Sequence, residues 1–415
     1  MTVNIGGEFM IETYTCRNGV RIVLENIPTV RSVTMGVWVG TGSRYESETN
    51  GGISHFLEHM FFKGTKTKSA QEIAESFDAI GGQVNAFTSK EYTCYYARVL
   101  DTYKVYAMEV LADMFFHSVF PEDEIEREKK VVLEEIKMYE DSPDSHVHDL
   151  LAKANFGNHP LGRPIIGTEA LVRSFTKKSL QDYRKECYVP ENVVISIAGN
   201  VDVTFIQTVE QLFDQFEQQS QLMERTKPTM LFDTIVKHKE IEQAHACFGF
   251  RGIAVDDERM PALMVLNSAL GNGMSSRLFQ EVREKRGLAY SVFSYHSAYL
   301  DSGVLGIYAG TNKEQLPLLE ETIIDTIEDI KKNGLMEKEF HNKKEQLKGN
   351  LVLGSESTNS RMSRNGRNEL LLKKHRTLDE LLKGIDQVDH TMINEVIEHI
   401  FTGKYSKAVI MSETK

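Results

Sequence analysis

The order of predicted strands and helices occurs twice along the chain of 415 residues, and this repetition constrains the fold more than any other feature. In the first half, runs rich in β-branched and aromatic residues predict strands at 20–25, 33–40, 83–89, 92–100 and 192–199. In the second half, comparable runs predict strands at 234–240, 245–250, 288–297, 303–310 and 405–411. Helical periodicity fills the long segments between strands in both halves. The sequence therefore predicts two α/β halves, with a single long α/β domain as the alternative.

The two halves are separated by a polar segment that contains Pro228. Such a change of composition is typical of a join between domains. We therefore place an N-terminal domain at 1–217, a linker at 218–232 and a C-terminal domain at 233–415. Two domains also agree with the number expected for a chain of this length.

Charge and cysteine content exclude several classes of protein. The formal net charge of −12 disfavours nucleic acid as a partner, because phosphate binding needs a basic surface. The four cysteines are far apart and form no C-x-x-C pair, which argues against a disulfide framework and a cysteine metal site. The sequence shows neither a secretory signal nor an apolar stretch of about 18 residues. We expect no membrane contact and a cytoplasmic location.

The segment 51–64 contains an H-x-x-E-H pattern made by His55, Glu58 and His59. On a helix, His59 lies about 40° and Glu58 about 300° from His55, so the three share one face. Apolar residues occupy the opposite face. A helix with this distribution is buried on both sides, and its polar side chains then need partners. Chance proximity of two histidines is the alternative.

Two imidazoles one turn apart are ligands that suit zinc. A catalytic zinc takes three protein ligands and lowers the pKa of water in the fourth position. Glu58 lies beside the histidines and is placed to act as a general base toward that water. We therefore expect one zinc ion per chain, held by His55 and His59; two histidines with a carboxylate favour zinc over manganese or cobalt.

A third ligand is predicted in the acidic helix at 121–141. Measured from Glu128, Val132 lies at about 40° and Glu135 at about −20°, so both glutamates lie inside the apolar stripe. Buried carboxylates are paired or bind metal. We take Glu135 as the third zinc ligand and Glu128 as the residue that holds a ligand histidine in place. Ion pairs from both glutamates to Arg or Lys are the alternative.

These residues resemble the pitrilysin/insulysin family of metallopeptidases, whose signature is the inverted zincin motif H-x-x-E-H. The resemblance is greatest with the branch similar to the mitochondrial processing peptidase. It implies a third ligand about 76 residues after the second histidine, where Glu135 stands, and a second glutamate where Glu128 stands. The chain shows no mitochondrial transit peptide, which suggests a bacterial cytoplasmic member.

Two further segments resemble the same family. The segment 81–96 resembles its edge strand, which implies that the backbone of Asn85, Ala86 and Phe87 pairs with an extended substrate. The segment 281–295 resembles its Arg/Tyr segment, which implies that Arg283 and Tyr290 contact the substrate and its developing oxyanion. From the residues alone, an internal hairpin, a solvated helical arginine and a strand tyrosine are the alternatives.

The resemblance implies an α+β fold with two homologous domains, each an antiparallel sheet backed by helices, that form a clam-shell peptidase unit. It also implies a zinc metalloendopeptidase that cleaves unfolded peptides and works as a homodimer. Residues 122–141 hold nine acidic and four basic residues, so a preference for basic peptides is a hypothesis. A non-catalytic peptide-binding or assembly subunit and a zinc hydrolase of small amides or esters are alternative functions.

Overall fold

The computed structural model describes residues 11–216 and 225–413, and the chain in it forms two compact units. The first unit comprises Met1–Lys137, Pro164–Arg225 and Gly354–Thr377, as far as these are described. The second comprises Met138–Arg163, Thr226–Leu353 and Leu378–Lys415. Of the predicted linker, residues 218–224 lie outside the described part of the chain. The predicted domain boundaries stay a prediction; these units differ from them because each takes a helix from the other half of the sequence.

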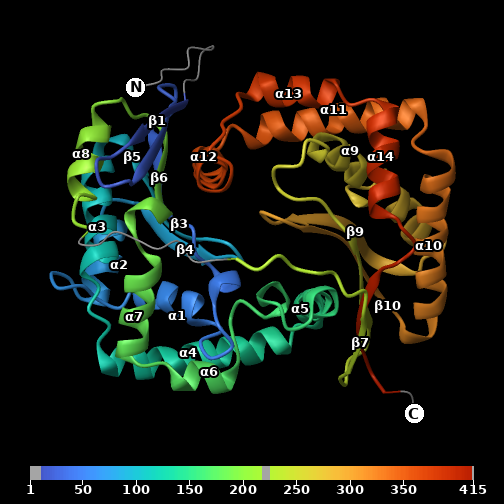
Figure 1. The fold of residues 1–415 in the computed structure, drawn as a ribbon, viewed down its shortest axis with the longest axis horizontal. Coiled ribbons are helices and arrows are strands. Elements are labelled where there is room, and N and C mark those ends of the chain that lie inside the picture. The colour runs from blue at the N-terminus through green and yellow to red at the C-terminus, as the bar shows by residue number, and fades with distance from the viewer. Residues whose placement is uncertain (1–10, 217–224, 414–415) are drawn as a thin grey trace. The chain divides into compact units, whose positions relative to one another are not determined.

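The first unit is built on a mixed sheet of six strands in the order β1-β2-β6-β3-β5-β4. Figure 1 labels β1, β3, β4, β5 and β6 of this sheet. Its strands in chain order are β1 (Ile11–Thr15), β2 (Arg21–Asn26), β3 (Ser32–Val39), β4 (Gln83–Thr88), β5 (Thr93–Leu100) and β6 (Val193–Gly199). The central strands β3 and β6 are buried almost throughout, whereas β1 and β4 at the two ends of the order are partly exposed. The functional candidates on β4 therefore lie at a sheet edge.

Helices cover both faces of this sheet. They are α1 (Ile53–Met60), α2 (Ala70–Asp78), α3 (Lys104–His117), α4 (Glu122–Glu140), α6 (Glu169–Ser174), α7 (Lys177–Cys187), α8 (Phe205–Leu212) and α12 (Thr358–Leu371). Alternate residues of β3 separate the two faces, as the pleat requires. Met35 and Val37 join the large core beneath α1 and α3, whereas Trp38 packs with Met362 of α12.

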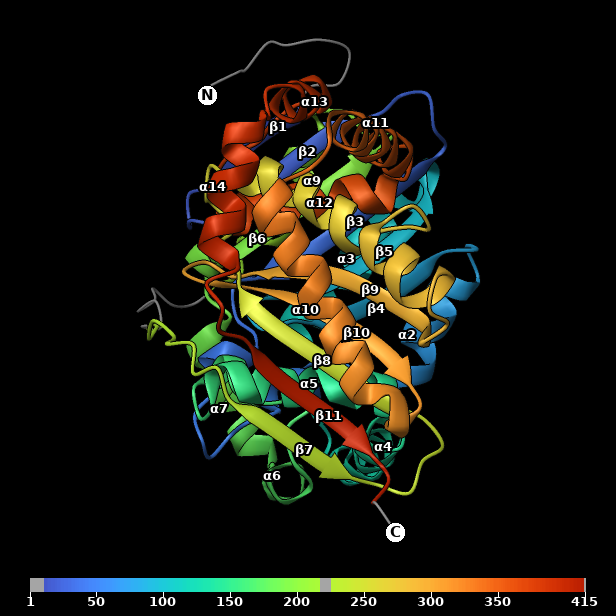
Figure 2. The same cartoon turned by 90° about the vertical axis from the view of Figure 1, so that its right-hand side faces the viewer.

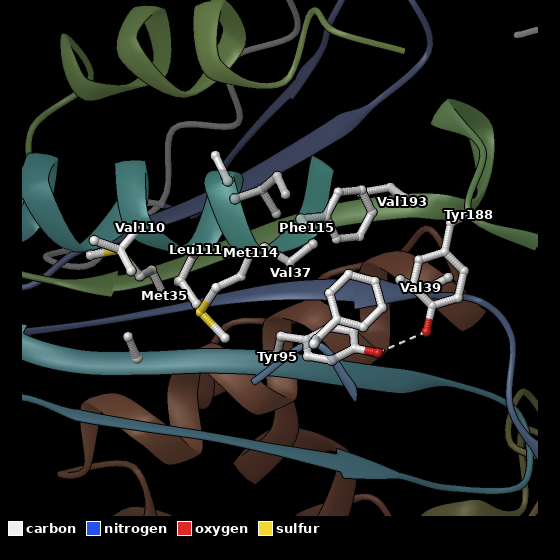
Figure 3. Close-up of a cluster of buried hydrophobic side chains, with 14 of the residues drawn as sticks. Met35, Val37, Val39, Tyr95, Val110, Leu111, Met114, Phe115, Tyr188 and Val193 are labelled. Atoms are coloured by element: carbon white, nitrogen blue, oxygen red, sulfur yellow. Dashed lines mark hydrogen bonds between the residues drawn. The ribbon is translucent and has the colours of Figure 1, made fainter. Parts of the chain in front are cut away.

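Figure 3 shows part of the large core of the first unit, where Leu111, Met114 and Phe115 of α3 lie near Met35, Val37 and Tyr95 of the sheet. Tyr95 of β5 and Tyr188 share a hydrogen bond of 2.9 Å between their hydroxyl groups. Phe61, directly after α1, stacks on Tyr188 with ring centroids 5.7 Å apart. This packing fixes the apolar side of α1 and therefore the direction of its polar side.

The second unit has a five-stranded sheet in the order β7-β11-β8-β10-β9, seen face-on in Figure 2. Its strands are β7 (Thr234–His238), β8 (Ala244–Arg251), β9 (Ala289–Ala298), β10 (Gly303–Thr311) and β11 (Ser406–Met411). Its helices are α5 (Pro143–Phe156), α9 (Met260–Gly271), α10 (Leu316–Asn333), α11 (Glu337–Gly354), α13 (Leu378–Asp386) and α14 (His390–Ile400). On β8, Phe248 joins the core shared with α9 and α10, and Cys247 packs with Leu151 of α5.

The two sheets share one topology once β1 is set aside. In chain order, five strands of each sheet are arranged as first, last, second, fourth, third. The prediction of two halves, each with a sheet backed by helices, is confirmed. The expectation that the sheets are antiparallel needs a correction, because β2 pairs with β6 and β7 with β11 in parallel. Each parallel pair joins the first strand to the last, and the long helical connection between them permits this pairing.

Candidate metal centre

Helix α1 is fixed at its N-terminus by a buried carboxylate and a glycine. Glu46 accepts hydrogen bonds from the backbone N–H groups of Gly52, at 2.7 Å, and Ser54, at 2.8 Å. A carboxylate at this end satisfies unpaired donors and favours the helix dipole. Gly52 has a φ of +93°, and a Cβ there would lie 2.7 Å from the carbonyl oxygen of Ile166. Only glycine suits this position.

The two faces of α1 follow from its sequence. Ile53, Phe56, Leu57 and Met60 are buried in the large core of the first unit. His55, Glu58 and His59 occupy the remaining face and are only partly buried as whole residues. The burial of four apolar side chains therefore directs the H-x-x-E-H groups away from the core.

Helix α4 brings two glutamates to this face. Ile125 and Val132 are buried and belong to the apolar stripe of α4. Glu128 lies within that stripe, and only 3% of this residue is exposed. Oε1 of Glu135 lies 3.7 Å from Nε2 of His55, and its Oε2 lies 3.6 Å from Nε2 of His59. One ligand atom from each of His55, His59 and Glu135 lies within 4.8 Å of the others. The structure thus brings together the three predicted zinc ligands.

These distances test whether a metal ion fits the three residues. Tetrahedral zinc with bonds of roughly 2.0–2.1 Å places its ligand atoms about 3.3 Å apart. The two histidine–glutamate separations exceed this by a few tenths of an ångström, and a nitrogen, nitrogen, oxygen donor set suits zinc. The residues therefore fit a zinc ion.

His59 is held by a chain of charged groups. Its Nδ1 donates a hydrogen bond of 2.7 Å to Glu128, whose other oxygen pairs with Nζ of Lys63 at 2.6 Å. With the proton on Nδ1, the lone pair of Nε2 is directed at Glu135. Burial lowers the pKa of His59, but the hydrogen bond to Glu128 and the charges of three glutamates outweigh it and raise that pKa. Burial raises the pKa of Glu128, but hydrogen bonds from His59 and Lys63 bring it below its usual value.

His55 has a different environment. Burial, together with the neighbouring His59, lowers the pKa of its imidazole to about 3, so the ring is neutral over the physiological range. Its Nδ1 is buried and has no hydrogen-bond partner within 11–216 and 225–413. A buried polar atom without a partner is costly unless the other side of the ring gains something in return. A metal bond at Nε2 would supply that gain.

Glu58 lies beside the ligand group without belonging to it. Oγ1 of Thr88, the last residue of β4, donates a hydrogen bond of 2.5 Å to its carboxylate. Burial raises the pKa of Glu58, and the bond from Thr88 offsets part of that rise. A carboxylate with a raised pKa beside a metal centre is suited to accept and return a proton.

The other predicted substrate residues lie on β4 and in the second unit. Asn85, Ala86 and Phe87 belong to β4, and the Ala86 N–H group donates to the Asn85 side chain at 2.8 Å. Arg283 belongs to a π-helix over Phe279–Glu284, and its guanidinium lies 4.5 Å from the ring centroid of Tyr290 and donates to the Tyr290 carbonyl oxygen at 2.9 Å. Tyr290 is 78% exposed.

Three residues of the centre were missed by the sequence reasoning: Glu46, Lys63 and Thr88. Lys63 stands four residues after His59 and past the end of α1, so its nearness to the motif in the sequence was a signal, but helical spacing was not. Thr88 directly follows the Asn-Ala-Phe segment, but its contact with Glu58 depends on how β4 packs against α1. Glu46 lies in a loop and gave no local pattern.

No helix within the described part of the chain combines the length and apolar character needed to cross a membrane.

Comparison with known proteins connects this geometry to a family. Residues 21–169 match the model of the insulinase domain of peptidase family M16, and residues 174–347 match the model of the peptidase M16 inactive domain. A Bacillus subtilis (strain 168) protein named uncharacterized zinc protease YmxG is 59% identical over 401 residues, 97% of this chain and 98% of the relative. A Streptomyces coelicolor protein named uncharacterized zinc protease SCO5738 is 41% identical over 98% of this chain and 91% of its own.

Solved structures agree in fold. A Pseudomonas fluorescens structure described as a peptidase M16 inactive domain has a TM-score of 0.91 at 20% identity and covers 97% of this chain and 98% of its own. A Helicobacter pylori structure described as a protease has a TM-score of 0.90 at 23% identity and covers 97% of this chain and 99% of its own. The resemblance predicted from the H-x-x-E-H motif is confirmed: the chain belongs to peptidase family M16.

Proposed function

We propose that this protein is a zinc metalloendopeptidase that cleaves unfolded peptides. The observation that carries the proposal is the meeting of His55, His59 and Glu135 within 4.8 Å, with the Glu58 carboxylate beside them. The names of the relatives, which describe zinc proteases, support the same conclusion.

His55, His59 and Glu135 would hold one zinc ion per chain, and Glu128 would keep the His59 ring in the tautomer that binds through Nε2. When bound, zinc lowers the pKa of water and polarises a carbonyl oxygen. Lys63 balances the charge of Glu128, so that this carboxylate can remain ionised in its buried position.

Glu58 performs the proton transfers in this proposal. Its carboxylate takes a proton from the water whose oxygen attacks the scissile carbonyl carbon. The same proton then passes from Glu58 to the peptide nitrogen as the carbon–nitrogen bond breaks, which leaves a free carboxyl group and a free amine. The raised pKa of Glu58 suits both steps, because the group must accept the proton and then release it.

Strand β4 is the proposed binding site for the peptide backbone. It is the last strand in the order of its sheet, and its final residue, Thr88, donates to Glu58. A peptide added as a strand beside Asn85, Ala86 and Phe87 would gain main-chain hydrogen bonds that do not depend on its sequence. Such binding requires an extended chain and so favours unfolded peptides.

Arg283 and Tyr290 are proposed to contact the substrate and to stabilise the developing oxyanion. The support is the family resemblance and their mutual packing, which leaves Tyr290 exposed. Loss of a donor to an oxyanion costs roughly 10²–10³ in kcat, and we expect Tyr290→Phe to lower kcat with little change in stability.

Cleavage of a quenched-fluorescent basic peptide tests the proposal, with and without a chelator. Glu58→Gln should retain zinc, measured by elemental analysis, and lose turnover. Glu134→Gln is the matched control, because Glu134 is exposed on α4 beside Glu135 and pairs with Lys137. Chelator-insensitive cleavage, or equal rates for Glu58→Gln and the natural chain, would overturn the proposal. An intact peptide despite bound zinc would favour the non-catalytic subunit.

Two finer properties are also proposals: a homodimer and a preference for basic peptides. On α4, Asp123, Glu126 and Glu134 each pair with a cation of the same helix. These pairs reduce the net acidic charge of α4, on which the proposed preference for basic peptides depends. Light scattering of the protein as it elutes from a size-exclusion column measures its molecular mass and tests the homodimer. Equal cleavage of peptides that differ only in Lys and Arg content would exclude the second.

A further inference from the structure

A cavity of about 510 Å³ lies in the first unit between α3 and α7, in a part of the molecule that the proposed peptidase chemistry does not use. Phe115 and Phe116 of α3 and Tyr188 after α7 supply aromatic walls. Lys66, Arg184 and Lys185 supply cationic groups, and none of the lining residues within the described part of the chain is acidic. A volume of this size is in the range of small-molecule sites.

Arg184 is the most informative of these groups, because it is partly buried and has no acidic partner among the described residues. One guanidinium nitrogen donates to the backbone carbonyl of Phe116 at 2.7 Å, and the guanidinium lies 5.7 Å from the ring centroid of Phe61. Within the residues described, no carboxylate forms a salt bridge with it. Burial lowers its pKa, and neighbouring tyrosines counter this only in part. An arginine withdrawn from water is usually paired with an anion, and among the described residues Arg184 has no such partner.

Two carboxylates on the helices that line the cavity already have other partners. Asp113 is already engaged by His117, at 2.9 Å, and by the hydroxyl groups of Thr65 and Thr67. Asp182 of α7 pairs with Lys178. Nζ of Lys66 and of Lys185 makes no salt bridge in the part of the chain that the structure covers. Among the residues that the structure describes, the three cations that line this aromatic cavity thus form no salt bridge with a carboxylate.

We propose that this cavity binds a small anion that carries an aromatic ring, such as an aryl phosphate or an aromatic carboxylate. Arg184 and Lys185 would hold the anionic group, because charge-assisted hydrogen bonds are the strongest that a side chain can offer. The rings of Phe116 and Tyr188 would cover the aromatic group through offset or edge contacts. This proposal is independent of the peptidase chemistry.

Calorimetric titration of the full chain, treated with chelator, tests the proposal with phenyl phosphate and benzoate as probes. We expect binding of at least one of them, weaker at higher salt, and the comparison of the two identifies the preferred anionic group. Lys185→Gln should weaken binding about tenfold or more, as expected for loss of one charge-assisted contact. Lys177→Gln is the matched control, because Lys177 is on the same helix but does not line the cavity.

The aromatic part of the proposal needs its own variants. Phe116→Leu keeps an apolar wall without the ring, so it should weaken binding of phenyl phosphate but leave that of inorganic phosphate unchanged. Arg184→Gln should abolish binding of both probes; circular dichroism shows whether it folds, and Lys185→Gln carries the test if it does not. No heat with either probe, or equal affinities for Lys185→Gln and Lys177→Gln, would overturn the proposal.

Discussion

At the scale of single residues, the tautomer of His59 decides whether the centre can hold a metal. Glu128 accepts the Nδ1 proton at 2.7 Å and leaves Nε2 with its lone pair facing Glu135. Lys63 makes this arrangement possible, because it stabilises a carboxylate that is almost fully buried. Lys63 contacts Glu128, and Glu128 contacts His59. A substitution of Lys63 or Glu128 would therefore alter the metal ligand His59.

Glu128→Gln is therefore expected to weaken zinc binding by roughly tenfold or somewhat more. Glutamine can still accept the Nδ1 proton of His59, but it lacks the charge that raises the basicity of the imidazole and balances Lys63. Competition with a fluorescent chelator measures the zinc dissociation constant directly. Glu126→Gln is the control, because Glu126 is exposed on the same helix and pairs with Lys129. Equal dissociation constants for the two variants would contradict this role of Glu128.

Much of the candidate centre could be predicted from spacing. The i, i+3, i+4 arrangement placed His55, Glu58 and His59 on one face, and the apolar stripe of α4 placed Glu128 and Glu135 on another. The structure brings these faces together, although the roles of the residues stay predictions. Thr88 and Glu46 could not be predicted, because their contacts with α1 depend on the packing of a strand and a loop that are distant in sequence.

At the scale of elements, the helix α12 closes the second face of the six-stranded sheet through one close contact. Trp38 is the chain's single tryptophan, and its indole Nε1–H points at the sulfur of Met362 at 3.3 Å. Gly366, one turn further along α12, has so little space that a Cβ would lie 2.3 Å from that nitrogen. The absence of a side chain at Gly366 thus lets the helix approach the sheet.

Gly366→Ala is expected to destabilise the protein by about 1–3 kcal/mol, because the added methyl group overpacks a buried contact. Emission from Trp38 should shift to longer wavelength as α12 moves away. Gly349→Ala is the control: Gly349 also lies inside a helix, α11, but nothing stands within 4 Å of its added Cβ. Urea unfolding should show Gly349→Ala unchanged or more stable by about 0.5–1 kcal/mol. A loss of stability of the same size in both variants would exclude the steric account.

The same helix carries a pH-dependent anchor. Glu369 accepts from Arg21 at 3.0 Å and from His375 at 2.7 Å. Burial raises the pKa of Glu369, but the hydrogen bond from His375 and the charge of Arg21 outweigh it and lower that pKa. Because the folded state holds the carboxylate with a depressed pKa, the stabilisation is present above the pKa of an unfolded glutamate, about 4.3, and is lost as pH falls through the folded value.

Glu369→Gln should therefore lose about 1–3 kcal/mol of unfolding free energy at pH 7. The difference in unfolding free energy between this variant and the natural chain should become smaller as the pH falls below about 4, because Glu369 of the natural chain is then protonated. Urea unfolding at several pH values measures this difference. Glu321→Gln on α10 removes an exposed carboxylate and should leave stability nearly unchanged at each pH. If Glu369→Gln lowers the unfolding free energy by the same amount at every pH, the stabilisation does not depend on the ionisation of Glu369, and the prediction is wrong.

Most elements could be predicted because they are long and strongly patterned. The predicted strand at 83–89 corresponds to β4, and the predicted acidic helix at 121–141 corresponds to α4. Strand β1 and the helices α6 and α8 were missed; α6 and α8 are short helices without a motif such as the one that marks α1. The packing partners of α5 and α12 could not be predicted, because an apolar stripe shows which face is buried but not what covers it.

At the scale of the whole molecule, the two units repeat one strand order, but neither unit is a single continuous half of the chain. The five-strand topology occurs in both, with the first and last strands parallel. In both units, the face of the sheet that its neighbouring helices leave uncovered receives a helix from the other half of the sequence: α12 in the first and α5 in the second. The repeated fold is thus completed only when both halves of the chain are present.

Because each unit takes a helix from the other half of the sequence, we can predict the behaviour of a fragment that contains only residues 1–216. Residues 1–216 contain every strand of the six-stranded sheet but lack α12, so the apolar face that includes Trp38 and Val194 would be exposed. The fragment also retains α5, whose Val147 and Leu151 would lose the sheet that buries them. Large exposed apolar patches cause aggregation. We expect the fragment to bind a hydrophobic dye and to lack a cooperative thermal transition, whereas fusion to residues 354–377 should restore much of that transition and shift Trp38 emission to shorter wavelength. A cooperative transition in the unfused fragment would show that α12 is dispensable for the first unit.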